Sequence, residues 1–196
     1  MTRSQQLHDH PINDGHTLPR AAAAITIVGN PKAGSRTLSA ATALTDALIE
    51  RWSGSGDNAA AKNKVIDLAD IAGGLLAPWS LSDEAANAVS QARSADLLIV
   101  ASPTYKASFT GLLKLLLDAL PAGSLSDTVV VPLVISGAPT HGHLADVHLR
   151  PVLAELGAVM PAPSLLLLES ELNNRNHLLK SYVDRYASTI VAALRK

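Results

Sequence analysis

The chain of 196 residues contains no cysteine. This absence excludes disulfide bonds, a thiolate nucleophile and a cysteine-ligated iron–sulfur cluster. Any redox chemistry would therefore need a bound organic cofactor or a metal site without thiolates. We expect a cytoplasmic location, which the lack of an apolar signal-peptide core near the amino terminus also favours.

An excess of charge of one sign is missing too. The chain has 16 basic and 17 acidic residues, a formal net charge of -1, and no basic run. This balance argues against nucleic acid or an anionic membrane as the main partner. No apolar run reaches the roughly 18 residues that a membrane-spanning helix requires. Small molecules or other proteins are the expected partners.

Apolar segments are present in a regular alternation. Residues 1–22 are polar and predict a disordered extension, whereas residues 23–196 have the length and the apolar content of one domain with a full core. Strands are expected at about 24–29, 64–68, 96–102, 128–136 and 164–169, and helices at about 37–52, 83–94, 110–120, 144–156 and 176–194. Residues 69–82 are expected to form an irregular connection. Five strands that alternate with helices predict a doubly wound α/β fold, with a five-stranded parallel sheet in the flavodoxin-like order 2-1-3-4-5.

The segment from residue 25 to residue 37 is the first candidate site. A buried strand stops at Gly29, and the following turn brings Ser35, Arg36 and Thr37 to the start of a helix. The first backbone N–H groups of a helix have no partner within it, and the helix dipole adds partial positive charge there, so an anion binds readily. Hydroxyl groups and a guanidinium suit a terminal monophosphate such as that of FMN.

Two better-known phosphate loops are excluded at this position. A Walker A loop needs a lysine and then serine or threonine directly after Gly34, and the dinucleotide fingerprint needs glycine where Pro31 stands. We therefore predict that Asn30, Ser35, Arg36 and Thr37 bind a phosphate. An ordinary strand-to-helix turn with a capping serine is the alternative reading.

Two further loops are expected to meet this segment, because ligands of such sheets bind beyond the carboxyl ends of the strands at the switch point. In the second loop, Pro103, Thr104 and Tyr105 would lie beside a planar ring. In the third loop, backbone N–H groups would face the ring edge that becomes negative on reduction. The residues of the third loop are Ser136, Gly137 and Ala138.

Nearby cations have weaker assignments. Lys106 would attract the phosphates of a nicotinamide cofactor, or it is an ordinary exposed lysine. His141 would border the nicotinamide pocket. His141 and His143 lack the carboxylates or cysteines that would complete a metal site, so no metal is expected.

These motifs resemble the NADPH-dependent FMN reductase family, especially reductases that supply flavin to two-component monooxygenases such as alkanesulfonate monooxygenase. The resemblance rests on Gly29-Asn30-Pro31 with Gly34-Ser35-Arg36-Thr37, on residues 101–114 (Ala-Ser-Pro-Thr-Tyr-Lys-Ala-Ser-Phe-Thr-Gly-Leu-Leu-Lys) and on residues 149–153 (Leu-Arg-Pro-Val-Leu). It implies a flavodoxin-like fold and hydride transfer from NAD(P)H to FMN. Sulfonate-linked members often carry an inserted aromatic residue before the Leu-Arg-Pro segment, whereas this sequence has none between Asp146 and Leu149.

The resemblance also implies a homo-oligomer. Family members associate through the helix after Gly111, which corresponds to the Thr110 to Leu120 segment here and is surrounded by leucines. A homodimer or homotetramer is therefore expected, with a flavin-dependent monooxygenase as a further partner. No catalytic residue is expected, since hydride transfer to flavin depends chiefly on how the two rings are positioned.

Three other functions fit the same residues. The first is an FMN-containing quinone or azo reductase. The second is a flavodoxin-like electron carrier, although carriers of that kind are usually strongly acidic and frame the ring with two aromatics. The third is a non-catalytic flavin-sensing module. The near-neutral charge and the low aromatic content of 3% favour the reductase over the carrier.

Overall fold

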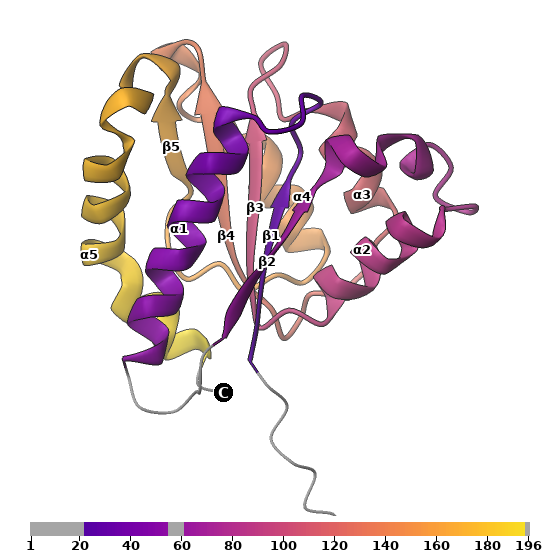
Figure 1. Cartoon of the computed structure of the whole chain (residues 1–196), viewed down its shortest axis with the longest axis horizontal. Coiled ribbons are helices and arrows are strands. Elements are labelled where there is room, and N and C mark those ends of the chain that lie inside the picture. The colour runs from indigo at the N-terminus through magenta and orange to yellow at the C-terminus, as the bar shows by residue number, and fades with distance from the viewer. Residues whose placement is uncertain (1–21, 55–60, 195–196) are drawn as a thin grey trace, which may run out of the picture.

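A parallel sheet lies between two layers of helices in the computed structural model, which describes residues 22–54 and 61–194 (Figure 1). The expected extension at residues 1–22 lies almost wholly outside the described residues. The strands are β1 (Ala23–Val28), β2 (Lys62–Asp67), β3 (Leu97–Pro103), β4 (Val129–Ser136) and β5 (Leu165–Leu168). Their order is β2-β1-β3-β4-β5 and every neighbouring pair is parallel, so the predicted topology is confirmed.

The α-helices cover both faces of the sheet. They are α1 (Arg36–Ser53), α2 (Asp83–Arg93), α3 (Gly111–Asp118), α4 (Arg150–Glu155) and α5 (Arg175–Leu194). Helices α1 and α5 pack on one face and form one apolar cluster with it. Helices α2, α3 and α4 contribute to a second cluster on the opposite face. Among the described helices, none is long and apolar enough to cross a membrane.

The two central strands explain why the sheet is doubly covered. Every residue of β3 and β4 is buried, as expected for parallel strands that have helices on both faces. Edge strand β2 has no fully buried residue. Because all five strands run the same way, their carboxyl ends lie along one edge, and the loops that follow β1, β3 and β4 begin there.

Short helical turns appear where the sequence predicted something else. Residues 68–75 form the 3-10 helix η1 (Leu68–Leu75) within the connection expected to be irregular. The helix expected at 144–156 begins instead as a π-helical turn, η3 (Ala145–Leu149), in which the Arg150 N–H donates to the Ala145 carbonyl. Pro151 has no N–H to donate back to the residue 147 carbonyl, so the regular α-helical ladder cannot continue through this point. Two more 3-10 turns are η2 (Pro139–His141) and η4 (Glu169–Asn174).

Candidate functional site

The first loop is held in shape by its own side chains. The Lys32 N–H donates to Asn30 Oδ1 at 3.0 Å, and Asn30 Nδ2 donates to Thr37 Oγ1 at 3.2 Å. Gly34 has φ +62°, a left-handed conformation that glycine adopts without steric cost. Ser35 caps α1 by accepting from the Leu38 N–H at 3.2 Å. Because this cap uses the Leu38 N–H, an anion at the start of α1 would be bound by the N–H groups of Arg36 and Thr37.

An aspartate from the neighbouring strand fixes the same loop. Asp67 ends β2, and its Oδ2 accepts from the Gly34 N–H at 3.1 Å while its Oδ1 accepts from the Ala69 N–H at 3.3 Å. Asp67 falls near the end of the strand expected at 64–68, but no role was predicted for it. The available signal was that a charged residue at a strand's carboxyl end lies at the ligand edge of a parallel sheet.

The second loop is a tight hairpin after β3. Tyr105 and Ser108 exchange backbone hydrogen bonds of 2.8 and 3.1 Å across Lys106 and Ala107. Both central residues have positive φ, 49° and 59°, which is uncommon for side chains with a Cβ and marks a strained turn. The turn carries Tyr105 outward, so that its residue is 52% exposed. A ring lying against this loop would cover the exposed tyrosine.

Thr104 precedes the hairpin and carries an unused polar atom. Its N–H donates to the Ile135 carbonyl at 2.8 Å, which ties the second loop to β4. Its Oγ1 is buried and has no hydrogen-bond partner among the described residues. Buried hydroxyl groups in proteins are nearly always hydrogen-bonded, so this unpaired atom is unusual, although Thr104 does not line the cavity where the first two loops meet.

Thr110 joins the first two loops. Its hydroxyl donates to the Gly29 carbonyl and accepts from the Leu113 N–H at 3.1 Å, and its own N–H donates to Ser102 Oγ at 3.1 Å. The strand end at Gly29 therefore lies directly against the start of α3. A Cβ on Gly29 would come within 2.5 Å of the Leu113 Cβ, so only glycine allows this approach.

Some polar groups of the third loop form hydrogen bonds within the loop itself. Ser136 is fully buried, its Oγ donates to the Ala138 carbonyl at 2.9 Å, and the Ala138 N–H donates to Ser136 Oγ at 3.2 Å. The space beside Gly137 is open except for Glu169 Oε2, which lies 3.9 Å from the position of an added Cβ. Of the predicted ring-edge donors, the Ala138 N–H is already used inside the loop by Ser136. His141 lies farther on in η2 and is half-buried.

A cavity of about 280 Å³ opens where the first two loops meet. Six predicted site residues line it: Asn30, Ser35, Arg36, Thr37, Pro103 and Tyr105. The other six, Thr104, Lys106, Ser136, Gly137, Ala138 and His141, lie outside its lining, on the second and third loops. Lys32, Gly34, Ile135, Glu169 and Leu172 complete the wall and were not predicted. Glu169 ends the strand expected at 164–169, so the signal available for Asp67, a charged residue at the carboxyl end of a strand, was available for Glu169 too.

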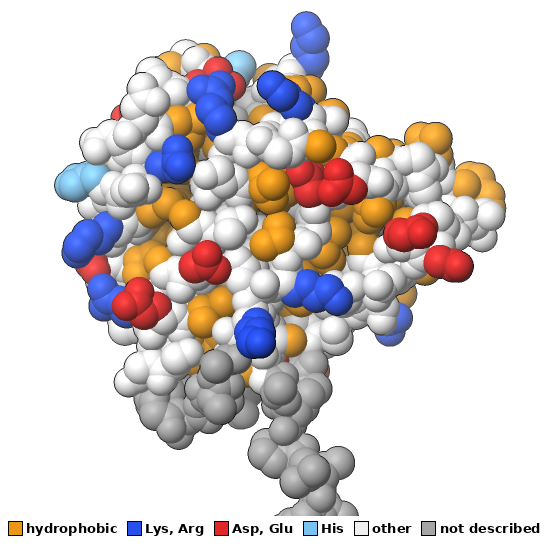
Figure 2. Space-filling model, in the orientation of Figure 1, with side chains coloured by type: hydrophobic (Ala, Val, Ile, Leu, Met, Phe, Trp, Pro, Cys, Tyr) orange, Lys and Arg blue, Asp and Glu red, His pale blue; other side chains and the backbone are white. Residues whose placement is uncertain are grey.

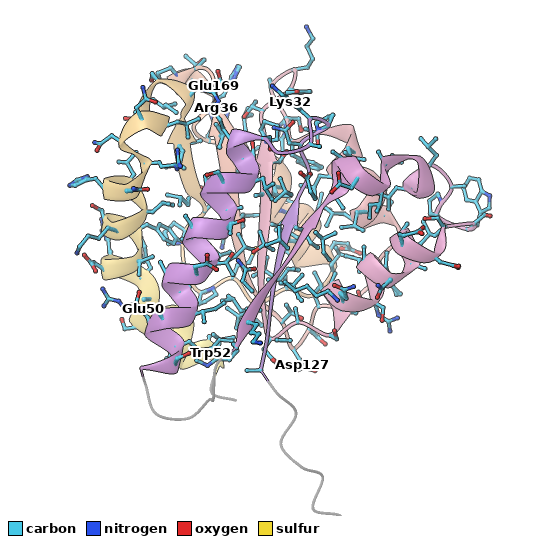
Figure 3. The ribbon with its side chains drawn as sticks, viewed as in Figure 1. Lys32, Arg36, Glu50, Trp52, Asp127 and Glu169 are labelled. Carbon is cyan, nitrogen blue, oxygen red and sulfur yellow. The ribbon has the colours of Figure 1, made fainter. Side chains whose placement is uncertain are left out.

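The charges around this cavity are mixed. Arg36 Nη2 lies 3.5 Å from Glu169 Oε1, and both side chains are more than half exposed. Lys32 lies on the same edge of the molecule, and Figure 3 shows it above the first loop with Arg36 and Glu169 close together beside it. In Figure 2, basic and acidic side chains gather at this edge, above the carboxyl ends of the strands.

The cavity fits the phosphate end of FMN. The first turn of α1, Ser35 and Arg36 offer hydrogen-bond donors and positive charge for a phosphate, and Lys32 adds a second cation. Pro103 and Tyr105 offer apolar surface for a ring. Its volume is at the small end for a ligand pocket, so the ring would lie across the open mouth rather than be enclosed.

The π-helical turn touches the second loop. His148 Nδ1 lies 3.0 Å from Ser108 Oγ, within hydrogen-bond distance. The Leu-Arg-Pro segment after it is structural, because Arg150 donates to the carbonyls of Ala162 and Met160 at 2.9 and 3.3 Å. Within residues 22–54 and 61–194, no group of three or more histidines and carboxylates could hold a metal ion.

Comparisons with known proteins agree with this geometry. Residues 23–171 match the profile of a family described as NADPH-dependent FMN reductase. An FMN reductase (NADPH) of Pseudomonas aeruginosa is 33% identical over 153 residues, which cover 76% of this chain and 78% of the relative. An NADH-dependent FMN reductase of Pseudomonas fluorescens is 34% identical over 145 residues, covering 72% and 74%.

A solved structure extends the comparison to three dimensions. The apo form of an NADH:FMN oxidoreductase superposes with a TM-score of 0.65 and 29% sequence identity, covering 86% of this chain and 94% of the other. The sheet order, the profile match over residues 23–171 and the 33% identical relative lead to one conclusion: the chain belongs to the NADPH-dependent FMN reductase family, whose members are flavodoxin-like NAD(P)H:FMN oxidoreductases.

Proposed function

We propose that this chain binds FMN across the first two loops and presents the flavin ring to NAD(P)H. The observation that carries the proposal is that the phosphate-binding start of α1 and the Tyr105 hairpin line one cavity. Bound FMN would supply a ring that accepts the hydride of NAD(P)H, with one further proton completing the reduced flavin. The protein's part is to hold the two rings in contact.

Each predicted residue has a role in this binding. Ser35, Arg36 and Thr37 hold the phosphate, and Asn30 keeps the first loop in shape. Pro103, Thr104 and Tyr105 support the ring, and the backbone of Ser136 to Ala138 faces its polar edge. Lys106 and His141 flank the place where a nicotinamide would enter. None of these residues exchanges a proton in this scheme, because catalysis by ring alignment needs no acid or base.

We further propose that reduced FMN leaves the site and serves a flavin-dependent monooxygenase. The support is exposure: within the described residues, the Arg36 side chain is 63% exposed and Tyr105 is 52% exposed, so a flavin bound against them would lie at an open surface. A ligand held at an open edge exchanges more easily than one enclosed on all sides.

A homo-oligomer that associates through α3 is also part of the proposal. A groove of about 450 Å³ runs between α3 and α4, lined by Leu117, Leu120, Pro151 and Val152 among others. It is larger than the site cavity, and it lies on α3 and α4 and not on the three loops. Its walls include Lys114 and Asp118, which pair at 2.5 Å. A second copy of this chain, offering the same apolar and charged surface, would fill it.

The proposed reaction is tested by following NADPH and NADH oxidation at 340 nm. Oxidation should depend on both the protein and added FMN, and it should fall with Arg36→Ala but not with Arg93→Ala. Arg93 is the matched control because it lies in the last turn of α2, near the opposite edge of the sheet. Oxidation no faster than the flavin-only background would rule out the reductase, while a yellow protein without that oxidation would point to an electron carrier.

A further inference from the structure

Glu169 holds an unexpected position at the phosphate-binding end of the cavity. It is the first residue after β5, and its side chain reaches back over the sheet edge to Arg36, at 3.5 Å. Its second oxygen faces the open space beside Gly137. Figure 3 shows the carboxylate and the guanidinium together at the carboxyl edge. The cavity thus contains a carboxylate beside the cation that would bind a phosphate.

A carboxylate at this place opposes an anionic ligand. A phosphate that contacts Arg36 would lie within several ångströms of Glu169, and like charges at that distance repel each other. The phosphate would also have to compete with Glu169 for the same guanidinium. Partial exposure weakens both effects, because water and salt screen the charges.

The local hydrogen bonds do not explain the carboxylate. The other nearby acids have structural partners: Asp67 accepts from two backbone N–H groups, and Glu171 accepts from the Leu168 N–H at 3.3 Å. The described contact of Glu169 is with Arg36, a single exposed ion pair, and such pairs contribute little to stability. The position of Glu169 therefore matters more for the ligand than for the fold.

We propose that Glu169 limits the affinity for FMN by competing with its phosphate for Arg36. The inference rests on the proposed function, since it concerns the same cavity. In the empty site Glu169 neutralises Arg36, and on binding the phosphate displaces it. The residual repulsion then favours release, so that FMN exchanges as a substrate. Glu169 acts on the ligand only through Arg36, and it is not a catalytic residue.

The experiment compares Glu169→Gln with the wild-type chain by fluorescence titration of FMN and of riboflavin. The substitution keeps the shape of the side chain and removes its charge. We expect FMN to bind about 3- to 20-fold more tightly and riboflavin, which lacks the phosphate, to bind unchanged. The gain should shrink between 20 mM and 500 mM salt, where charges on the surface are increasingly screened.

Glu50→Gln is the matched control. Glu50 lies near the opposite end of α1 from Arg36 (Figure 3). Its substitution removes the same charge from the molecule as Glu169→Gln does. It should leave FMN affinity unchanged, and circular dichroism should confirm that both variants fold as the wild type does.

The outcomes separate the inference from the function beneath it. If wild-type protein binds neither flavin, the proposed function fails. If it binds FMN but Glu169→Gln weakens or does not change that affinity, the flavin site stands and the inference is wrong, since a carboxylate that merely orients Arg36 would weaken binding when neutralised. A gain that is equal for FMN and riboflavin would also overturn it.

Discussion

Single residues of the first loop combine structural and ligand-binding roles. Ser35 both caps α1 and lines the cavity, while Arg36 lines the cavity without holding the helix. Losing a serine cap costs about 1 kcal/mol of stability, so a serine variant changes more than the ligand site. Arg36 is therefore the cleaner residue for a test of phosphate binding.

Replacing Ser35 and Arg36 together with alanine should weaken FMN binding by about 2–4 kcal/mol, the sum of one neutral and one charge-assisted hydrogen bond. Arg36→Ala alone should account for about 1.5–3 kcal/mol of this loss. Fluorescence titration measures both, with Arg93→Ala as the control. An unchanged FMN affinity in the double variant would mean that the phosphate binds elsewhere.

Sequence reasoning found half of the cavity lining at this scale. The six lining residues that were predicted follow strand ends in the local pattern of the sequence: Asn30, Ser35, Arg36, Thr37, Pro103 and Tyr105. Glu169 and Asp67 were missed as site residues because their contacts join distant parts of the chain. The carboxylate of Asp67 reaches a residue 33 positions away, and no local pattern reports such a partner.

At the scale of elements, the junction between β1 and α3 fixes the position of the first loop relative to the second. Thr110 bonds to Gly29 and to Ser102, the latter within β3, and the backbone at Gly29 approaches Leu113 closely. The start of α3 is thus fixed against two strands. A change in this junction would move the phosphate site relative to the ring site.

Gly29→Ala should destabilise the protein by about 1–3 kcal/mol, because its added carbon would have to displace Leu113 from a packed core. Gly111→Ala is the control, since a Cβ there meets nothing within 4 Å and alanine favours a helix. Urea unfolding gives both free energies. Equal stability of Gly29→Ala and the wild type would show that the junction yields at little cost.

The strands were predicted to within about two residues, and the short turns were not. Apolar runs fix a buried strand directly, as in β3 and β4, whose residues are all buried. The π-helical turn at Ala145–Leu149 has the same apolar spacing as an ordinary helix over so short a span. What distinguishes it is the missing N–H of Pro151, and only the folded backbone shows how the chain accommodates that loss.

On the scale of the whole molecule, the sheet separates two apolar clusters. The cluster with α1 and α5 is on the face away from α3, and the cluster with α2, α3 and α4 adjoins the apolar groove. The doubly wound order followed from the alternation of elements and the handedness of crossovers. Association between copies was expected from the leucines of the Thr110 to Leu120 segment and from the family resemblance, and it stays a prediction, because it depends on surface shape that a sequence does not record.

Val152→Glu should dissociate the proposed homo-oligomer, since Val152 is half-buried in the groove and a charge there would lose water on association. Light scattering after gel filtration should give a multiple of the 20.4 kDa chain mass for the wild type and a lower mass for the variant. Leu76→Glu is the control, because Leu76 is 71% exposed and outside the groove lining. A monomeric wild type would end the proposal that α3 is an interface.

The hydroxyl of Thr110 has a consequence for ligand choice. The Thr110 hydroxyl bonds to Gly29 at the end of β1, and the Thr110 N–H bonds to Ser102 in β3. These two bonds fix the distance between the proposed phosphate site after β1 and the proposed ring site after β3. This fixed separation selects for the length of the chain that joins the phosphate to the ring. A flavin with a longer or shorter chain could occupy the phosphate site or the ring site, but not both.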